Sequence, residues 1–225
     1  MRPNPALGNI ISTVTDAQII RHELFVNFSL NLMKPSPTAG NATFHWRRLA
    51  ANGSYSYIRA RRNAMGPFDV PATGTLDTEW GHGPADNPYR VNVGITSTQV
   101  KNLSVNLSLN ASDGFPYNQT TGFDDNQDGL LNDRPAGVGI WALRTTQVWW
   151  LNTRVTYNLP LPFSAAKATG PTPPRYRASV YAAVNNLTNH ANLIGFSGVM
   201  TSPFFMTATA VQNPRKVDMG FTLSF

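Results

Sequence analysis

The segment Leu103-Ser104-Val105-Asn106-Leu107-Ser108-Leu109-Asn110-Ala111-Ser112 alternates apolar and polar residues without a break. Side chains of a β-strand point to opposite faces in turn, so this segment predicts a strand with one apolar face and one face of Asn and Ser. The last nine residues, 217–225, repeat the pattern with Val, Met, Phe and Leu on one side. Because amphipathic helical periodicity is nearly absent elsewhere, the sequence predicts an all-β fold.

Further alternating segments predict the remaining strands and the lengths of their connections. Strands are expected near residues 215–225, 176–186, 143–158, 103–112, 89–99, 42–62 and 22–33, with a weaker one near 8–18. The turn around Lys101 is tight, whereas the connections 63–88, 113–141 and 187–213 are long. Outer-membrane barrels alternate short periplasmic turns with long extracellular loops. The sequence therefore predicts an antiparallel transmembrane β-barrel segment of about eight strands, with its carboxyl end in the periplasm.

Composition favours the same class of protein. Only 13% of the 225 residues are charged, against about 25% in a typical soluble domain. The polar rows of the predicted strands carry Asn, Ser, Thr and Gly, which suit a wet lumen better than a surface facing bulk water. The chain has no cysteine, which excludes a disulfide scaffold and Cys-based metal or redox sites. A soluble β-sandwich or barrel, with its apolar rows turned inward, remains the alternative.

Strand length and aromatic residues fit a membrane crossing. Residues 217–225 span roughly 30 Å at about 3.3 Å per residue, and a tilt near 40° reduces this to about 23 Å. The apolar band of an outer-membrane barrel is about 25 Å tall. Tyr157, Tyr176 and Phe225 are expected at the periplasmic interface and Trp149 near the outer one, as in an aromatic girdle.

The first residues of the chain show no secretion signal, whereas the last residues resemble a signal for insertion into the outer membrane. Residues 1–8 lack the apolar core of a secretion signal, which predicts either a cytoplasmic chain or the later part of a longer polypeptide. At the other end, Asp218, Gly220, Leu223 and Phe225 form a pattern that resembles the carboxyl-terminal insertion signal of outer-membrane proteins. Such a strand pairs with the barrel-assembly machinery through its open edge. An ordinary closing strand is the alternative reading.

Four short stretches carry a wider resemblance. They are Glu79-Trp80-Gly81 with Asp86, residues 124–135 (DDNQDGLLNDRP), residues 185–190 (NNLTNH) with 202–205 (SPFF), and Asn213-Pro214-Arg215. In their order and spacing, the chain resembles TonB-dependent outer-membrane receptors, in particular the Oar-like group with a carboxypeptidase-regulatory-like amino-terminal domain. The resemblance implies that residues 1–225 are the carboxyl-terminal part of the receptor barrel, without its plug and its amino-terminal barrel strands.

The resemblance also implies a location and a set of partners. The chain would lie in the outer membrane of a Gram-negative bacterium, in contact with lipid and lipopolysaccharide. It would supply barrel wall and outer loops for uptake of an extracellular ligand that the sequence does not identify, with the TonB complex acting through the missing plug. A complete small barrel of structural or adhesive role is the alternative, and its closure would require the strand near 8–18 to pair with 215–225.

One loop has the residue spacing of a calcium site. Asp124, Asn126 and Asp128 precede Gly129 at the i, i+2 and i+4 positions that supply oxygen ligands in calcium loops. Pro135 stands where an EF-hand has its bidentate Glu, so a complete EF-hand is excluded, and Asp133 or Asn132 would close a partial site. An Asp/Asn-rich turn held by its own side chain–backbone hydrogen bonds is the alternative.

The remaining candidate binding or catalytic residues are a basic stretch and four scattered histidines. Arg47, Arg48, Arg59, Arg61 and Arg62 surround Tyr55 and Tyr57. Basic residues among aromatics are compatible with nucleic-acid binding by a soluble β domain. We expect them instead at the upper lumen or the extracellular rim, facing lipopolysaccharide or an anionic ligand, with no nucleic acid as partner. The four histidines show no metal-ligand spacing and no catalytic motif occurs, so neither an enzyme nor a cofactor is expected.

Overall fold

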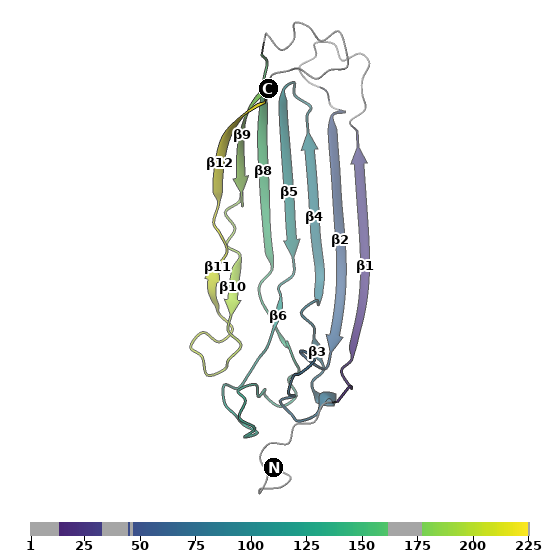
Figure 1. The fold of residues 1–225 in the computed structure, drawn as a ribbon, viewed down its shortest axis with the longest axis vertical. Coiled ribbons are helices and arrows are strands. Elements are labelled where there is room, and N and C mark those ends of the chain that lie inside the picture. The colour runs from purple at the N-terminus through teal and green to yellow at the C-terminus, as the bar shows by residue number, and fades with distance from the viewer. Residues whose placement is uncertain (1–13, 33–44, 46, 162–176, 225) are drawn as a thin grey trace.

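The structure is a computed structural model that describes residues 14–32, 45, 47–161 and 177–224. Seven long strands form an antiparallel meander in the order β1-β2-β4-β5-β8-β9-β12 (Figure 1). They are β1 (Ile19–Asn31), β2 (Leu49–Arg62), β4 (Asn87–Ser97), β5 (Leu103–Ser112), β8 (Val148–Leu159), β9 (Arg177–Asn185) and β12 (Lys216–Ser224). The short strand β3 (Gly81–His82) pairs with the end of β2 and makes the sheet eight-stranded.

The all-β prediction is confirmed, and the sheet is consistent with a segment of a β-barrel. Within the described residues no pairing joins β1 to β12, so the barrel is not closed. The connections contain two small hairpins and one short helix. They are β6 (Pro116–Tyr117) with β7 (Leu143–Arg144), β10 (Leu193–Phe196) with β11 (Ala208–Val211), and the 3₁₀ helix η1 (Leu76–Thr78). No helix in the part of the chain that the structure describes is long and apolar enough to cross a membrane.

Most predicted strands match the observed ones within three residues, but three predictions need correction. The predicted strand 42–62 begins only at Leu49, because residues 45, 47 and 48 are not in a strand and residues 42–44 and 46 lie outside the described residues. The predicted strand 143–158 is broken, because Leu143 and Arg144 pair with β6 in the preceding loop and β8 begins only at Val148. The Thr145 amide donates to the Phe115 carbonyl at 2.9 Å, which holds this stretch away from the sheet. The weaker strand near 8–18 is not seen over residues 14–18, and its first part lies outside the described residues. The eighth strand of the sheet is β3 instead.

The register aligns the apolar residues of all seven long strands on one face. Val93 pairs with Gly53 and with Leu109, and Leu109 pairs with Leu151. We call this the apolar face: even-numbered residues 24–30 of β1, odd-numbered residues 51–57 of β2, 91–95 of β4, 103–111 of β5 and 149–159 of β8, even-numbered residues 178–184 of β9, and odd-numbered residues 217–223 of β12. The alternate residues of the same strands form the polar face.

The apolar face is open to its surroundings rather than packed against a second layer. Leu24, Phe28 and Phe221 are each more than half exposed, and Met219 is 79% exposed. Buried apolar side chains are few among the described residues, and Ile140 and Val148 are the largest of them. A soluble sandwich would bury these rows between two sheets. A continuous apolar surface of this extent is typical of a face that meets lipid or a large partner.

The three long connections lie together at one end of the sheet, opposite the tight β4–β5 turn (Figure 1). The carboxyl end of β12 lies at the end with the tight turn. This arrangement agrees with the predicted alternation of short turns and long loops. Trp149 and Tyr157 both belong to the apolar face, at opposite ends of β8, as the aromatic girdle requires. Tyr176 and Phe225 lie outside the described residues.

Glycine and aromatic residues form two cross-strand pairs that shape the sheet. Phe28 stands opposite Gly53 on the apolar face, and Tyr181 stands opposite Gly220 on the polar face. A Cβ atom at either glycine would overlap the ring of its partner. The Tyr181 ring is covered on its other side by Arg154, whose guanidinium carbon lies 3.8 Å from the ring centroid. Gly220, which belongs to the predicted assembly signal, thus lies against the Tyr181 ring because it has no side chain of its own.

Gly220→Ala is expected to lower the free energy of unfolding by about 1–3 kcal/mol, the usual cost of overpacking. The added methyl group would push the Tyr181 ring toward Arg154, which leaves the ring no free space. Urea unfolding of the protein in lipid vesicles measures the change. In a Tyr181→Ala background the same substitution should cost almost nothing, and equal costs in both backgrounds would contradict this contact between Gly220 and Tyr181. Gly66→Ala, where no atom lies within 4 Å of the new Cβ, is the matched control.

Candidate functional site

The polar face carries a ladder of carboxamide and hydroxyl groups. One row runs from Asn27 through Ser54 and Asn92 to Asn110, each directly opposite the next in the register. The Asn92 side-chain amide donates to the Ser54 hydroxyl at 3.2 Å. A neutral row of this kind can both donate and accept hydrogen bonds, so it suits water or a polar solute.

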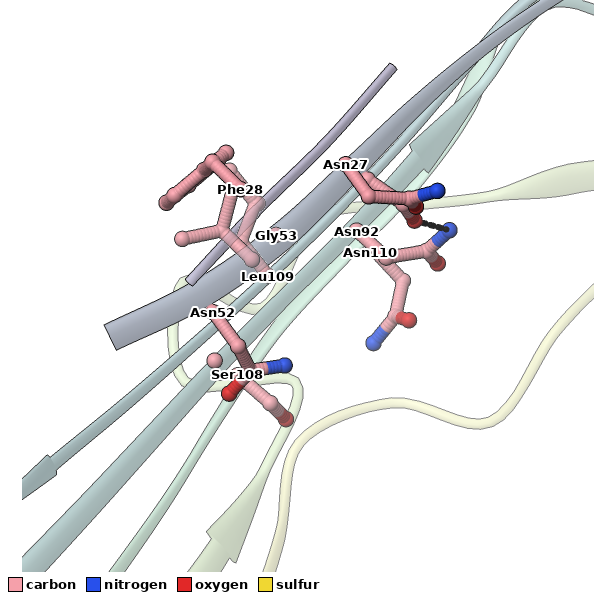
Figure 2. A pocket seen from close by; sticks show the side chains of 11 residues that line it. Asn27, Phe28, Asn52, Gly53, Asn92, Ser108, Leu109 and Asn110 are labelled. Carbon is pink, nitrogen blue, oxygen red and sulfur yellow. Dashed lines mark hydrogen bonds between the residues drawn. The ribbon is translucent and has the colours of Figure 1, made fainter. Parts of the chain in front are cut away.

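A hollow of about 450 Å³ lies over the centre of this ladder, where β1, β2, β4 and β5 are neighbours. Figure 2 shows the carboxamides of Asn27, Asn92 and Asn110 together on one side of the strands, with Phe28 and Leu109 on the other. Gly94 adds no side chain to the polar face here, and the Asn52 carboxamide lies over it. The polar side chains and the apolar side chains therefore lie on opposite faces of a single sheet.

A buried carboxylate joins the sheet to the long loops. Asp86 is 1% exposed and lies at the entry to β4. Its carboxylate accepts a hydrogen bond from the Ala60 amide of β2 at 2.8 Å and forms an ion pair with Arg144 of the β5–β8 loop. The His82 Nδ1 atom lies 3.0 Å from it. Arg144 also donates to the Gly114 carbonyl at 2.7 Å. Asp86 thus ties two loops to one point of the sheet.

A second buried ion pair holds the same two loops together. Glu79 and Arg134 form it, and both side chains are 3% exposed. Burial lowers the pKa of the Arg134 guanidinium, and the negative charge of Asp69 acts in the opposite direction. Beside this pair the loop backbones touch, because a Cβ atom at Gly81 would overlap the Ile140 carbonyl. The connections 63–86 and 113–147 therefore form one packed unit.

The predicted calcium loop is held by its own hydrogen bonds in the structure. The Asp133 carboxylate accepts from the amides of Asp125 and Asn126 at 2.7 and 3.2 Å. Asp124 accepts from the amides of Asp128 and Gly129, both at 3.0 Å. Among the described residues no group of three or more His, Cys, Asp or Glu side chains is arranged to hold a metal ion. Calcium binding by Asp124, Asn126, Asp128 and Asp133 stays a prediction.

The NNLTNH stretch forms the base of the third long loop. The Asn186 side chain accepts from the His190 amide at 3.0 Å and donates to the His190 carbonyl at 2.9 Å. The His190 ring stacks on Trp149 with 4.5 Å between centroids. Asn189 accepts from the amide of Arg215, just before β12, at 2.9 Å. These contacts close the loop at the point where it leaves and rejoins the sheet.

The assembly-signal residues divide between the two faces of β12. Leu223 belongs to the apolar face, opposite Ala178, and Gly220 and Asp218 belong to the polar face. Asp218 forms an ion pair of 2.9 Å with Lys216. Phe225 lies outside the described residues. The outer edge of β12 has no partner strand among the residues that the structure describes, so its backbone groups are available for strand addition.

The basic stretch does not form a single cluster. Arg59 and Arg61 belong to the same side of β2 as Tyr55 and Tyr57, beyond the end of the apolar face. Arg62 points the other way, with its guanidinium 5.4 Å from the ring centroid of Trp141 in the second loop. The sequence predicts all five arginines at the upper lumen or the extracellular rim, which is wrong for Arg47 and Arg48. They precede β2 beside the tight β4–β5 turn, at the end opposite the long loops, where the Thr98 amide donates to the Arg48 carbonyl at 3.0 Å. For Arg59, Arg61 and Arg62 the sequence does not assign a face. The register supplies that assignment, because it continues unbroken through β1 and β2.

Comparisons with known proteins support the fold. No protein-family model matches the chain, and no curated protein matches it. A solved structure does: the crystal structure of the ferric citrate transporter FecA in the unliganded form, with a TM-score of 0.51 and 14% sequence identity. The match covers 95% of this chain and 26% of that one. The chain is thus an antiparallel β-sheet protein consistent with a barrel segment, and its fold is similar to about a quarter of a ferric citrate transporter.

Proposed function

We propose that the chain forms part of the wall of a TonB-dependent outer-membrane transporter. Its apolar face would meet lipid and its polar face would line the lumen. The observation that carries this proposal is the exposed apolar face, which the register keeps continuous across all seven long strands. The fold similarity to a transporter supports the same reading, and the four sequence stretches support the Oar-like group. The long loops would reach the extracellular ligand, and TonB would act through a plug.

The contacts at the loop bases fit this role. The Asp86–Arg144 pair and the hydrogen bonds of Asn186 with His190 hold the loops to the sheet at one end only, and the Glu79–Arg134 pair holds two of the loops together. A ligand-binding surface built on loops needs such support, because each loop would otherwise lose conformational entropy on binding. The carboxamide ladder below them offers polar solutes a neutral path with few charges. No residue of this arrangement is proposed to perform a chemical step.

Single-cysteine labelling tests the proposal, because the chain contains no cysteine of its own. Leu109→Cys and Asn110→Cys are neighbours in β5 that belong to opposite faces. In the full-length protein in outer membranes, Asn110→Cys should react readily with a small, charged thiol reagent. Leu109→Cys should react at least about tenfold more slowly, because apolar surroundings raise the pKa of a thiol. Equal rates, or a protein that needs no detergent for extraction, would contradict the proposal.

A further inference from the structure

The apolar face gives way to cationic side chains on the β1–β2 pair, at the end that carries the long loops. The register pairs Leu24 with Tyr57 and, one row further, His22 with Arg59. Arg61 follows two residues later on the same side of β2. The change from apolar to basic therefore falls between consecutive rows. A Tyr marks the boundary, as is usual for residues at the membrane–water interface.

These side chains surround a hollow of about 460 Å³, lined by Ile20, His22, Arg59, Arg61 and Trp80. Both arginines are exposed. The Arg59 Nε atom donates to the Tyr57 hydroxyl at 3.2 Å, which positions the guanidinium over the edge of the apolar face. Arg61 forms no side-chain hydrogen bond or ion pair with the residues that the structure describes. Its donors are available to an external acceptor.

The nearest acid does not cancel this positive charge. The Asp86 carboxylate lies 3.8 Å from Arg59 Nη1. However, Asp86 is buried and already forms an ion pair with Arg144, so its charge is compensated from the loop side. Glu23, the acidic residue between His22 and Leu24, points to the opposite face and pairs with Arg21. The hollow therefore keeps a net positive charge directly beside an apolar surface.

We propose that His22, Arg59, Arg61 and Trp80 form a binding site for the phosphate group of an anionic outer-leaflet lipid. The guanidinium groups would chelate the phosphate, since Arg binds phosphate oxygens through paired N–H donors. The acyl chains would lie along Val26 and the neighbouring apolar residues of β1. A lipid would contact both the cationic hollow and the adjoining apolar face, whereas free phosphate would contact only the cationic hollow. The inference rests on the membrane orientation of the proposed function and not on transport.

Lipid retention by the full-length protein, purified from outer membranes into detergent, tests the site. Native mass spectrometry with added lipid A should show bound diphosphorylated lipid A and far less of its dephosphorylated form. Each Arg near an anionic surface contributes about fivefold in affinity. Arg61→Gln should therefore weaken binding about fivefold, and Arg59→Gln/Arg61→Gln about 25-fold. Arg90→Gln, on the polar face, removes the same formal charge and should change binding less than twofold.

Three results would overturn the site. They are equal retention of both forms of lipid A by the unmodified protein, equal weakening by Arg90→Gln and Arg61→Gln, and displacement of lipid A by inorganic phosphate at equal concentration. The last result would indicate a site for free phosphate. Arg61→Gln remains informative if the double variant does not assemble, because its side chain has no partner to lose among the described residues. Labelling of Leu109→Cys and Asn110→Cys separates a failure of this site from a failure of the membrane orientation.

Discussion

Leu107→Arg is expected to prevent stable insertion of the barrel, at a cost of about 2–4 kcal/mol. Leu107 belongs to the apolar face, four residues from the row of Trp149 and four from the row of Tyr157. If these aromatics mark the two interfaces, Leu107 lies near the middle of the bilayer. A charged side chain on the lipid side costs most at that depth. Urea unfolding in lipid vesicles, together with the amount of folded protein in outer membranes, measures the effect.

Ser108→Arg is the matched control for this substitution. Ser108 is the next residue of β5, points to the polar face and stands opposite Gly94 and Asn152. Its replacement adds the same charge, and a larger increase in side-chain volume, on the side that would face a wet lumen. The expected change is below about 1 kcal/mol, as for other exposed polar sites. A larger loss for Ser108→Arg than for Leu107→Arg would reverse the assignment of the two faces.

The sheet could be predicted from the sequence because its signal is local. A strand with one apolar face and one polar face must alternate at every second residue, so segments such as 103–112 define both their limits and their faces. The long loops were equally evident from the distances between such segments. The pairing of neighbouring strands then follows from the meander order, in which each long strand pairs with the next long strand along the chain.

The loop contacts could not be predicted in the same way, because they join residues far apart in the chain. Glu79 and Arg134 belong to two of the stretches that carried the family resemblance, yet no local pattern indicates that they meet. The sequence predicts Arg144 within the strand 143–158, but Arg144 lies outside the main sheet, where its side chain reaches Asp86, 58 residues earlier. Such pairs depend on how two loops fold against one another. The alternation of apolar and polar residues along the strands gives no information on that contact.

The stretches of the family resemblance acquire a common explanation from these contacts. Asp86, Glu79 with Arg134, and Asn186 with His190 all anchor a long loop to the loop end of the sheet or to a neighbouring loop. Gly81 permits the close approach of the two loop backbones. A receptor can vary the exposed parts of its loops freely if these anchors are kept. These residues of the four stretches therefore lie where the loops are held to the sheet or to one another.

The Glu79–Arg134 pair provides the sharpest test of this support. Arg134→Met would leave the Glu79 carboxylate buried without its counter-ion, which typically costs about 3–5 kcal/mol. The loss should appear as local opening of the two loops while the sheet remains folded, because the pair joins loops and not strands. Limited proteolysis of intact outer membranes measures that opening. Cleavage between residues 113 and 147 should become about 150-fold to 5,000-fold faster if opening and closing are fast.

A double variant distinguishes the ion pair from simple loss of packing. In Glu79→Leu/Arg134→Met both charges are replaced by apolar side chains, so most of the stability should return. Lys216→Met removes one partner of an exposed ion pair, with side chains 69% and 40% exposed, and should cost less than about 1 kcal/mol. If the double variant is cleaved as fast as Arg134→Met alone, the volume of the two side chains and not their charge holds the loops together. The two loops would then owe their packing to contacts such as that of Gly81 with Ile140, and the buried charges would be dispensable for the ligand surface.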